Sequence, residues 1–209
     1  RSPASYEELK RKAAAQERPR LSALPTDGVT LDGQLDEAAW ASAEPASGFL
    51  QFEPSEGAPA SQATEVRVLY GPGALYVGAT LNDAEPGLIE ASLGRRDEFN
   101  RADWFVVSID SYHDRRTAYA FGVNAAGVQF DAVQGGEGGG PGPGGGGGGQ
   151  DAPPGMDPSW DAIWSSAVAM TPQGWVVEVA IPYSMLRFRR ADSQTWGIQF
   201  SRHLPRSGE

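Results

Sequence analysis

The chain has 209 residues, of which 40% are hydrophobic, and this is enough for one domain with a substantial core. Its formal net charge of −10 makes nucleic acid an unfavourable partner. The absence of cysteine excludes disulfide bonds and thiolate metal sites, and no apolar run approaches the roughly 18 residues of a membrane-spanning helix.

Residues 1–25 are expected to form an N-terminal helical arm. Within it, Ser5–Gln16 favours a short helix, because Ser5 and Glu8 have the spacing of a capping box and Pro19 follows. The faces of this helix are charged or alanine-rich, so it is either a solvated arm or a helix that docks on another part of the protein. No signal peptide is visible and both ends of the sequence are abrupt, so we expect a processed N-terminus and a C-terminus cut from a longer polypeptide.

From residue 26 onward, short apolar runs alternate with turn residues, which is the spacing of all-β domains. The expected strands cover residues 64–70, 74–81, 104–109, 119–123, 128–133, 164–170, 175–181 and 196–200. Four tryptophans in or beside these apolar patterns are expected in the core: Trp40, Trp104, Trp175 and Trp196. The predicted fold class is all-β: a two-sheet antiparallel β-sandwich of jelly-roll or immunoglobulin-like type over residues 26–209, preceded by the short N-terminal helix.

A glycine tract, GGEGGGPGPGGGGGGQ, interrupts the strands at residues 135–150. We predict a flexible Gly-rich insertion over residues 135–158, because glycine loses the most conformational freedom when it is ordered. The alternative is a ligand-binding loop. A phosphate-binding loop, however, carries a Lys and a Ser or Thr beside its glycines, and this tract has neither.

The segment LDGQLDEAAW, Leu31–Trp40, allows two interpretations. In the first it is structural: its Asp-Gly pair forms a tight turn, Asp36 caps a one-turn helix with Glu37 at the positive end, and the final tryptophan plugs the open end of the sandwich. In the second, Asp32 and Asp36 are ligands of a structural Ca²⁺, because carboxylate oxygens suit this ion. The alternating ligand pattern of a dedicated calcium loop is absent.

LDGQLDEAAW resembles the opening signature of the family 9 carbohydrate-binding modules. Four more segments follow in the order of that family: Val66–Asp83 (VRVLYGPGALYVGATLND), Asp103–Asp110 (DWFVVSID), Gly174–Phe188 (GWVVEVAIPYSMLRF) and Trp196–Arg206 (WGIQFSRHLPR). Together they extend over most of residues 29–206. The resemblance implies a β-sandwich that binds carbohydrate without catalysis.

Two other segments resemble a subgroup of that family. Ser111–Ala132 and Trp160–Trp164 are similar to N-terminal domains of large bacterial envelope proteins, in which a long C-terminal part of unknown function follows and has the pattern of an outer-membrane β-barrel. This implies a location in the bacterial cell envelope, in the periplasm or at the outer-membrane surface. The implied partner is a glycan or the chain's own C-terminal β-barrel part. The chain is not predicted to be an enzyme, although it could belong to a larger glycan-acting hydrolase.

The resemblance also directs attention to one loop. The family stacks its sugar between two tryptophans; Asn100 stands in the position of the first, and the second falls beyond the end of this chain. The remaining candidates for a sugar site are polar residues ahead of a strand and one tryptophan beside the glycine tract. They are Arg95, Arg96, Asp97, Asn100, Asp103 and Trp160. Guanidinium and carboxylate groups can hold neighbouring hydroxyls, and a solvated loop with Arg–Asp pairs is the alternative.

Three functions therefore stay open. The first is a non-catalytic carbohydrate-binding domain, with Ca²⁺ as a structural cofactor. The second is a structural or interaction domain that docks on an outer-membrane β-barrel and has no sugar site. The third is a haem-binding sandwich, which needs two axial ligands in one pocket. The residues available for that role are His113, His203, Met156, Met170 and Met185.

Overall fold

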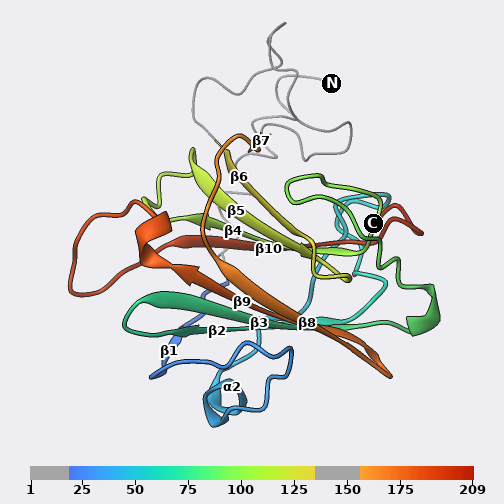
Figure 1. Ribbon diagram of the computed structural model, residues 1–209, viewed down its shortest axis with the longest axis horizontal. Coiled ribbons are helices and arrows are strands. Elements are labelled where there is room, and N and C mark those ends of the chain that lie inside the picture. The colour runs from blue at the N-terminus through green and yellow to red at the C-terminus, as the bar shows by residue number, and fades with distance from the viewer. Residues whose placement is uncertain (1–18, 135–155) are drawn as a thin grey trace, which may run out of the picture.

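The computed structural model describes residues 19–134 and 156–209, which form a sandwich of two five-stranded sheets (Figure 1). The first sheet has the order β1-β2-β3-β9-β8, with β1 at Leu24–Pro25, β2 at Thr64–Tyr70, β3 at Ala74–Asn82, β9 at Gly174–Pro182 and β8 at Ser165–Thr171. The second has the order β10-β4-β5-β6-β7, with β10 at Gly197–His203, β4 at Trp104–Asp110, β5 at Ala118–Asn124, β6 at Gln129–Gln134 and β7 at Met156–Asp157. The predicted all-β, two-sheet sandwich is confirmed.

The outer edge of β2 corrects the predicted domain boundary at residue 26. Leu24 and Pro25 form β1 and pair with the end of β2, while Leu21 packs against the core. The sandwich therefore begins before residue 26. The β1–β2 pair is also parallel, whereas the other strand pairs in the two sheets are antiparallel.

The glycine insertion is also shorter than predicted at its C-terminal end. Met156 and Asp157 form β7, which pairs with the end of β6 and therefore belongs to the second sheet. Residues 135–155 lie outside the described residues, and so does the helix predicted at Ser5–Gln16. No helix within residues 19–134 and 156–209 is long and apolar enough to cross a membrane.

The inner faces of the two sheets form the main core. Alternate residues of the central strands β3 and β9, such as Val77 and Val177, point inward and are fully buried. Phe105 and Phe121 meet them from the second sheet. Because the outer faces of these strands are covered as well, β3 and β9 read as nearly continuous apolar runs rather than as alternating ones.

Two chain segments cover the outer faces of the sheets. On the first sheet, Trp40 in the short helix α2 (Ala38–Ser42) packs with Ala43 and Leu69. On the second, Phe99 stacks on Trp104 with ring centroids 4.5 Å apart. Of the four tryptophans expected in the core, Trp40, Trp104 and Trp175 are buried, while Trp196 is half-buried.

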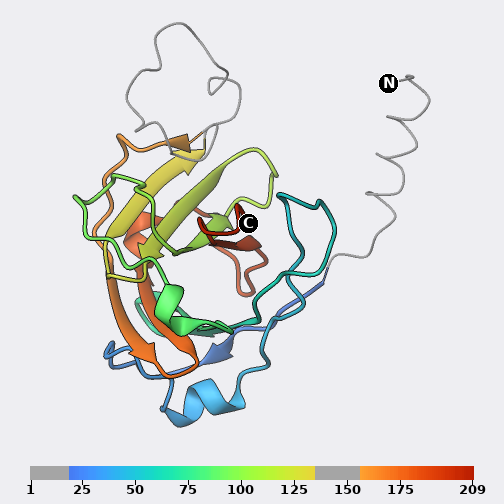
Figure 2. The same cartoon turned by 90° about the vertical axis from the view of Figure 1, so that its right-hand side faces the viewer.

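The loops gather at two opposite ends, which we name after the residues at the ends of β4. The Asp103 end carries residues 49–63, 83–103 with the 3₁₀ turn η1 (Pro86–Leu88), 125–128 and 203–209. The Asp110 end carries residues 71–73, 111–117 and 183–196 with the 3₁₀ turn η2 (Tyr183–Met185). In Figure 2, β6 (yellow) and β8 (orange) lie on one side of the sandwich, while residues 43–63 lie along the other.

Candidate functional site

The LDGQLDEAAW segment binds a buried carboxylate of the first sheet. Glu178 on β9 is fully buried, and its Oε2 accepts hydrogen bonds from the backbone N–H groups of Asp32 (2.9 Å) and Gly33 (2.8 Å). Its Oε1 accepts one from Nε1 of Trp40 at 3.3 Å. Burial raises the pKa of Glu178, and these donors oppose that rise. The segment is therefore a structural clamp, as the first interpretation proposed.

Two details of that interpretation are wrong. The residue before the first turn of α2 is Glu37 rather than Asp36, and its side chain makes no capping hydrogen bond but accepts from the backbone N–H of Thr30 at 2.8 Å. Trp40 does not plug an open end of the sandwich. It lies over the outer face at Gly78, where an added Cβ would stand 2.5 Å from Leu35 and 3.1 Å from the indole ring.

The two predicted calcium ligands do not make a calcium site together. The carboxylate of Asp32 accepts hydrogen bonds from the backbone and the side-chain amide of Gln34, which fold the turn. Ca²⁺ takes six to eight oxygen ligands. Among residues 19–134 and 156–209, no group of three or more His, Cys, Asp or Glu side chains could hold a metal ion. The carboxylate oxygens of Asp32 and Asp36 are therefore too few to hold Ca²⁺ by themselves, and calcium binding by the chain stays a prediction.

Among the predicted sugar ligands, Arg96 is an anchor between loops. Its guanidinium donates to Oδ1 of Asp131, to the backbone oxygen of Ala162 (2.6 Å) and to Oε1 of Gln129 (2.7 Å). Asp131 is fully buried on β6, and it also accepts from Nε1 of Trp164 at 3.0 Å. Arg96 thus holds two loops against the second sheet, and most of its donors are used inside the protein.

The structure does not bring the remaining candidates together. Asp97 accepts from the backbone N–H of Asp131 at 3.1 Å and lies 3.5 Å from Nε of Arg96, while Arg95 is exposed and makes no side-chain hydrogen bond or ion pair among the described residues. Asn100 donates to the backbone oxygen of Leu93 at 3.3 Å and thereby closes its own loop. Trp160 was expected to be exposed but is half-buried. Its ring packs against Tyr119 and Phe121 at the margin of the main core, with centroids 5.1 and 5.7 Å away, and its role as a ligand platform stays a prediction.

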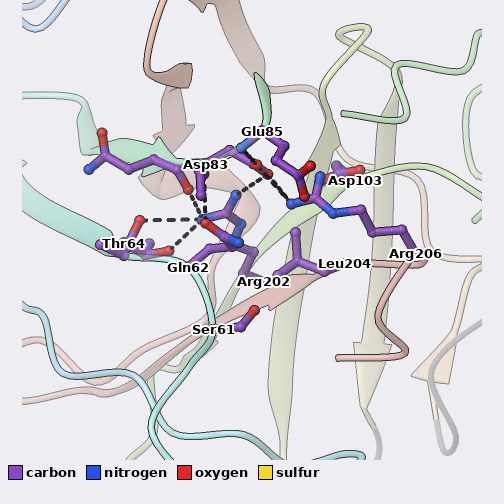
Figure 3. Close-up of polar contacts among 12 residues, drawn as sticks. Ser61, Gln62, Thr64, Asp83, Glu85, Asp103, Arg202, Leu204 and Arg206 are labelled. Atoms are coloured by element: carbon purple, nitrogen blue, oxygen red, sulfur yellow. Dashed lines mark hydrogen bonds and ion pairs between the residues drawn. The ribbon is translucent and has the colours of Figure 1, made fainter. Parts of the chain in front are cut away.

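Asp103 belongs to a cluster of buried charges at the Asp103 end (Figure 3). We call Asp83, Asp103, Arg202 and Arg206 the Asp83 cluster. Both oxygens of Asp83 lie 2.7 Å from Nη2 of Arg206, and Arg202 lies 3.6 Å from Oδ2. Arg202 also donates to the backbone oxygen of Asn82 at 2.8 Å and to the hydroxyl of Thr64 at 3.2 Å. The cluster joins the end of β3 to the end of β10, and therefore one sheet to the other.

The Asp83 cluster keeps unused hydrogen-bonding groups. Oδ1 of Asp103, Nε and Nη2 of Arg202, and Nη1 of Arg206 are buried without a hydrogen-bond partner. Burial raises the pKa of Asp103 and lowers that of Arg202, because both charged forms lose hydration. Two guanidinium groups face two carboxylates, so the cluster is close to neutral as a unit. Such a unit is costly to break, because a lost partner leaves a buried charge uncompensated.

Accessible polar groups surround this cluster. Arg101 donates to both oxygens of Glu90, each at 2.9 Å, and 70% of the Arg101 side chain is exposed. The guanidinium lowers the pKa of Glu90, and Arg206 and His203 add smaller effects in the same direction. Nearby, a hollow of about 350 Å³ opens between residues 93–96 and the turn at 126–129. Leu93 beside it is 83% exposed. The Asp103 end thus combines a surface ion pair with an apolar contact.

The two histidines lie at opposite ends of the second sheet. His203 pairs with Trp104 at the start of β4, and His113 follows the end of that strand. Seven strand residues separate these positions by roughly 23 Å. They cannot be the two axial ligands of one haem, so the haem hypothesis keeps only pairs that include a methionine, and it stays a prediction.

Sequence reasoning missed Asp83, Arg202 and Arg206. Asp83 follows β3, Arg202 is the last but one residue of β10, and Arg206 lies beyond that strand; the packing of the two sheets brings these positions together. A sequence signal existed. Asp83 and Asp103 stand at the two ends of the connection between β3 and β4, and the two arginines lie near the end of the last strand. The order of the strands was needed to see that these positions meet.

Known proteins share this fold without close sequence similarity. No protein-family model and no curated protein matches the sequence. A family 9 carbohydrate-binding module from Caldicellulosiruptor kristjanssonii, solved with glucose, aligns over 88% of this chain and 78% of its own at 15% identity and a TM-score of 0.58. A family 9 module from the same organism, solved with cellotriose, aligns over 85% and 73% at 16% identity and 0.54. A candidate carbohydrate-binding protein from Bacteroides uniformis aligns over 88% and 84% at 11% identity and 0.58.

At such low identities, the likeness establishes the fold. The chain has the β-sandwich of the family 9 carbohydrate-binding modules, as the order of its sequence segments predicted.

Proposed function

We propose that this chain is a non-catalytic carbohydrate-binding domain whose ligand meets the Asp103 end. The observation that carries the proposal is the likeness of the fold to carbohydrate-binding modules, two of which were solved with glucose and with cellotriose. Fold alone does not give a function, so the proposal also needs a suitable surface. The Asp103 end supports it, because a carboxylate, a guanidinium group and an exposed apolar side chain lie there in one loop between β3 and β4.

The Glu90–Arg101 pair and the hollow beside Leu93 are the parts of this surface that a sugar can reach. A carboxylate accepts hydrogen bonds from hydroxyl groups and a guanidinium donates to them, so the pair can hold two neighbouring hydroxyls. Leu93 offers apolar contact to the C–H face of a ring. Asn100 occupies the position that the resemblance gives to a stacking tryptophan, and its amide is engaged with the backbone oxygen of Leu93. We therefore expect weak binding, with a Kd on the order of 1 mM.

Calorimetric titration of a sugar panel tests this proposal. The panel contains glucose, xylose, cellotriose and xylotriose. Glu90→Gln and Arg101→Gln are each expected to lower the affinity for the sugar at least about tenfold, since each removes a charge-assisted hydrogen bond. Glu44→Gln is the matched control, because Glu44 is exposed on the other side of the first sheet, beside α2. Absence of saturable heat across the panel, from protein that unfolds cooperatively, would refute a sugar site.

We further propose that the domain works in the bacterial cell envelope, in the periplasm or at the outer-membrane surface. The support is the resemblance of Ser111–Ala132 and Trp160–Trp164 to N-terminal domains of envelope proteins. Fractionation of the producing bacterium, followed with an antibody against this domain, is expected to place the protein with the envelope. Recovery from the cytoplasmic fraction alone would contradict this location.

A docking domain for an outer-membrane β-barrel is the second candidate. It is supported by exposed apolar side chains at the Asp103 end, where Leu50, Phe52 and Leu88 are 65%, 83% and 52% exposed. Clustered exposed apolar residues are typical of interaction sites. In the full-length protein, docking is expected to protect the backbone amides of residues 49–60 from hydrogen exchange. A pure sugar-binding role predicts that those amides exchange equally in the isolated domain and in the full-length protein.

A further inference from the structure

The Asp110 end concentrates exposed positive charge in an acidic protein. Five arginines lie there on two loops, and they stand against a formal net charge of −10 for the whole chain. They are Arg115, Arg116, Arg187, Arg189 and Arg190. We call these five residues the arginine surface.

The two loops of the arginine surface are held together. The hydroxyl of Ser111 donates to the backbone oxygen of Arg187 at 2.6 Å, and Gly197 at the start of β10 pairs with Asp110 at the end of β4. The Asp110 carboxylate accepts the backbone N–H groups of Asp114 (3.1 Å) and Arg115 (2.7 Å). The arginine side chains therefore project from adjacent, fixed backbone positions.

The nearby carboxylates offset only part of the charge of the arginine surface, since three aspartates against five arginines leave a net charge of +2. Those of Asp110 and Asp114 are engaged with backbone N–H groups of their own loop, and the bonds from the N–H groups of Arg116 and Thr117 hold the pKa of Asp114 down. Asp192 is the third acidic side chain on these loops, and it is exposed. Across residues 19–134 and 156–209, no ion pair joins any of the five arginines to a carboxylate.

Aromatic rings lie among the arginines. Phe188 follows Arg187 and packs on Trp196 with centroids 5.1 Å apart, and both rings meet Tyr183. Tyr112, in the other loop, is 44% exposed. The planar fork of arginine matches a carboxylate in two parallel hydrogen bonds, and an aromatic ring packs on the apolar face of a sugar. This combination suits a chain of sugar units that carry carboxylates.

We propose that the arginine surface binds an anionic polysaccharide whose sugar units carry carboxylate groups. This site is separate from the one under the proposed function, since it lies at the opposite end of the sandwich and takes a charged ligand. The acidity of the rest of the protein does not prevent the interaction. A seven-residue strand separates the two ends by roughly 23 Å, whereas the Debye length is about 8 Å at physiological salt.

Binding of polygalacturonate at increasing NaCl concentrations tests this inference. At about 0.15 M NaCl, where the Debye length is about 8 Å, the wild-type protein is expected to bind polygalacturonate and not the neutral polymer dextran. Both double variants, Arg189→Gln/Arg190→Gln and Arg115→Gln/Arg116→Gln, are expected to weaken binding at least about tenfold and to reduce its salt dependence. The matched control is Arg20→Gln/Arg67→Gln, which removes the same charge from two residues outside both the arginine surface and the candidate sugar site and should leave binding unchanged.

Each other outcome overturns the inference. Equal weakening by the control variant would show that only net charge matters. Failure of the wild type to bind polygalacturonate at about 0.15 M NaCl, or binding that survives both double variants, would remove the site. Binding to vesicles with anionic lipid but not to polygalacturonate would assign the surface to a membrane instead. Because Glu90 lies at the opposite end, Glu90→Gln should leave polygalacturonate binding intact, which separates this test from that of the neutral-sugar site.

Discussion

The two ends of the sandwich use arginine in opposite ways. At the Asp103 end, Arg202 and Arg206 lie with 5% and 19% of their side chains exposed, and both reach Asp83. At the Asp110 end, the five residues of the arginine surface are exposed and meet no carboxylate among the described residues. The same side chain thus joins the two sheets at one end and faces solvent at the other.

Burial explains the difference. A charge removed from water needs a partner at close range, so the buried arginines accompany buried aspartates and contribute to stability only as a set. An exposed arginine keeps its hydration and contributes little to folding, which leaves it available for a ligand. We therefore expect substitutions to change stability at the Asp103 end and binding at the Asp110 end.

The largest effect is expected from Asp83→Ala. This change leaves Arg202 and Arg206 without their shared carboxylate, and breaking a buried ion pair in this way costs about 3–5 kcal/mol. Urea denaturation measures the loss of unfolding free energy. Asp192→Ala at the Asp110 end is the control, with an expected change below about 0.5 kcal/mol. Equal effects of the two changes would remove the distinction between the ends.

Arg96→Ala is expected to lower the free energy of unfolding by about 2 kcal/mol, because it removes one charged hydrogen-bond donor from the buried carboxylate of Asp131. The value is smaller than for Asp83, since 38% of the Arg96 side chain is exposed and Asp131 keeps its bonds from Trp164 and Ala162. Thermal unfolding of Arg96→Ala beside Arg95→Ala checks it. Wild-type stability in both variants would mean that Arg96 is a free ligand residue after all.

Asp103→Asn is expected to change how stability depends on pH. Burial raises the pKa of Asp103 above its ordinary value of 3.8, so between these two values the folded protein binds more protons than the unfolded chain. The cost of burying the charge is fully present above the raised pKa and declines as pH falls towards 3.8. Relative to Asp103→Asn, the wild type should therefore gain stability on acidification. A constant difference between pH 7 and pH 4 would contradict the raised pKa.

Removal of positive charge at the Asp110 end is expected to have little effect on folding. Arg189→Gln/Arg190→Gln should change the free energy of unfolding by less than about 0.5 kcal/mol in low salt, because both side chains are exposed. Chemical denaturation at 20 and 500 mM NaCl measures it. A loss above about 2 kcal/mol would show that these arginines have structural partners.

The smallest effect is expected from calcium. Since the carboxylate of Asp32 accepts hydrogen bonds from Gln34, the oxygens of Asp32 and Asp36 do not surround an ion. Millimolar Ca²⁺ should move the Tm by less than about 1 °C relative to EGTA, because a ligand that binds weakly adds little stability. A saturable rise of several degrees would establish a calcium site in the chain.

Much of the sandwich could be predicted from sequence because local patterns determine it. The eight expected strands are present within a few residues, and the hairpin turn at residues 124–127 forms where Asn124 accepts the N–H groups of Ala126 and Val128. The two-residue strands β1 and β7 were missed, because so short a segment has no period of its own.

The site was less predictable because its residues meet only through strand order. Arg96 and Asp103 lie in one loop, yet Arg96 bonds to Asp131 on β6, while the charge of Asp103 is influenced by Arg202 on β10. Trp160 beside the glycine tract was expected to be exposed, since sequence does not show that Tyr119 and Phe121 lie beneath it. The role of LDGQLDEAAW depends on Glu178, which is 138 residues beyond Trp40.

Chemical-shift mapping with cellotriose, glucose and xylotriose on the ¹⁵N-labelled domain is the most direct test of carbohydrate binding at the Asp103 end. The expected result is a saturable set of shifts for one of these sugars within residues 84–103 and 203–209, with Glu90 and Arg101 among them and residues 111–117 unaffected. No saturable shift with any of the three sugars, or shifts confined to another face of the sandwich, would contradict a carbohydrate site at this end.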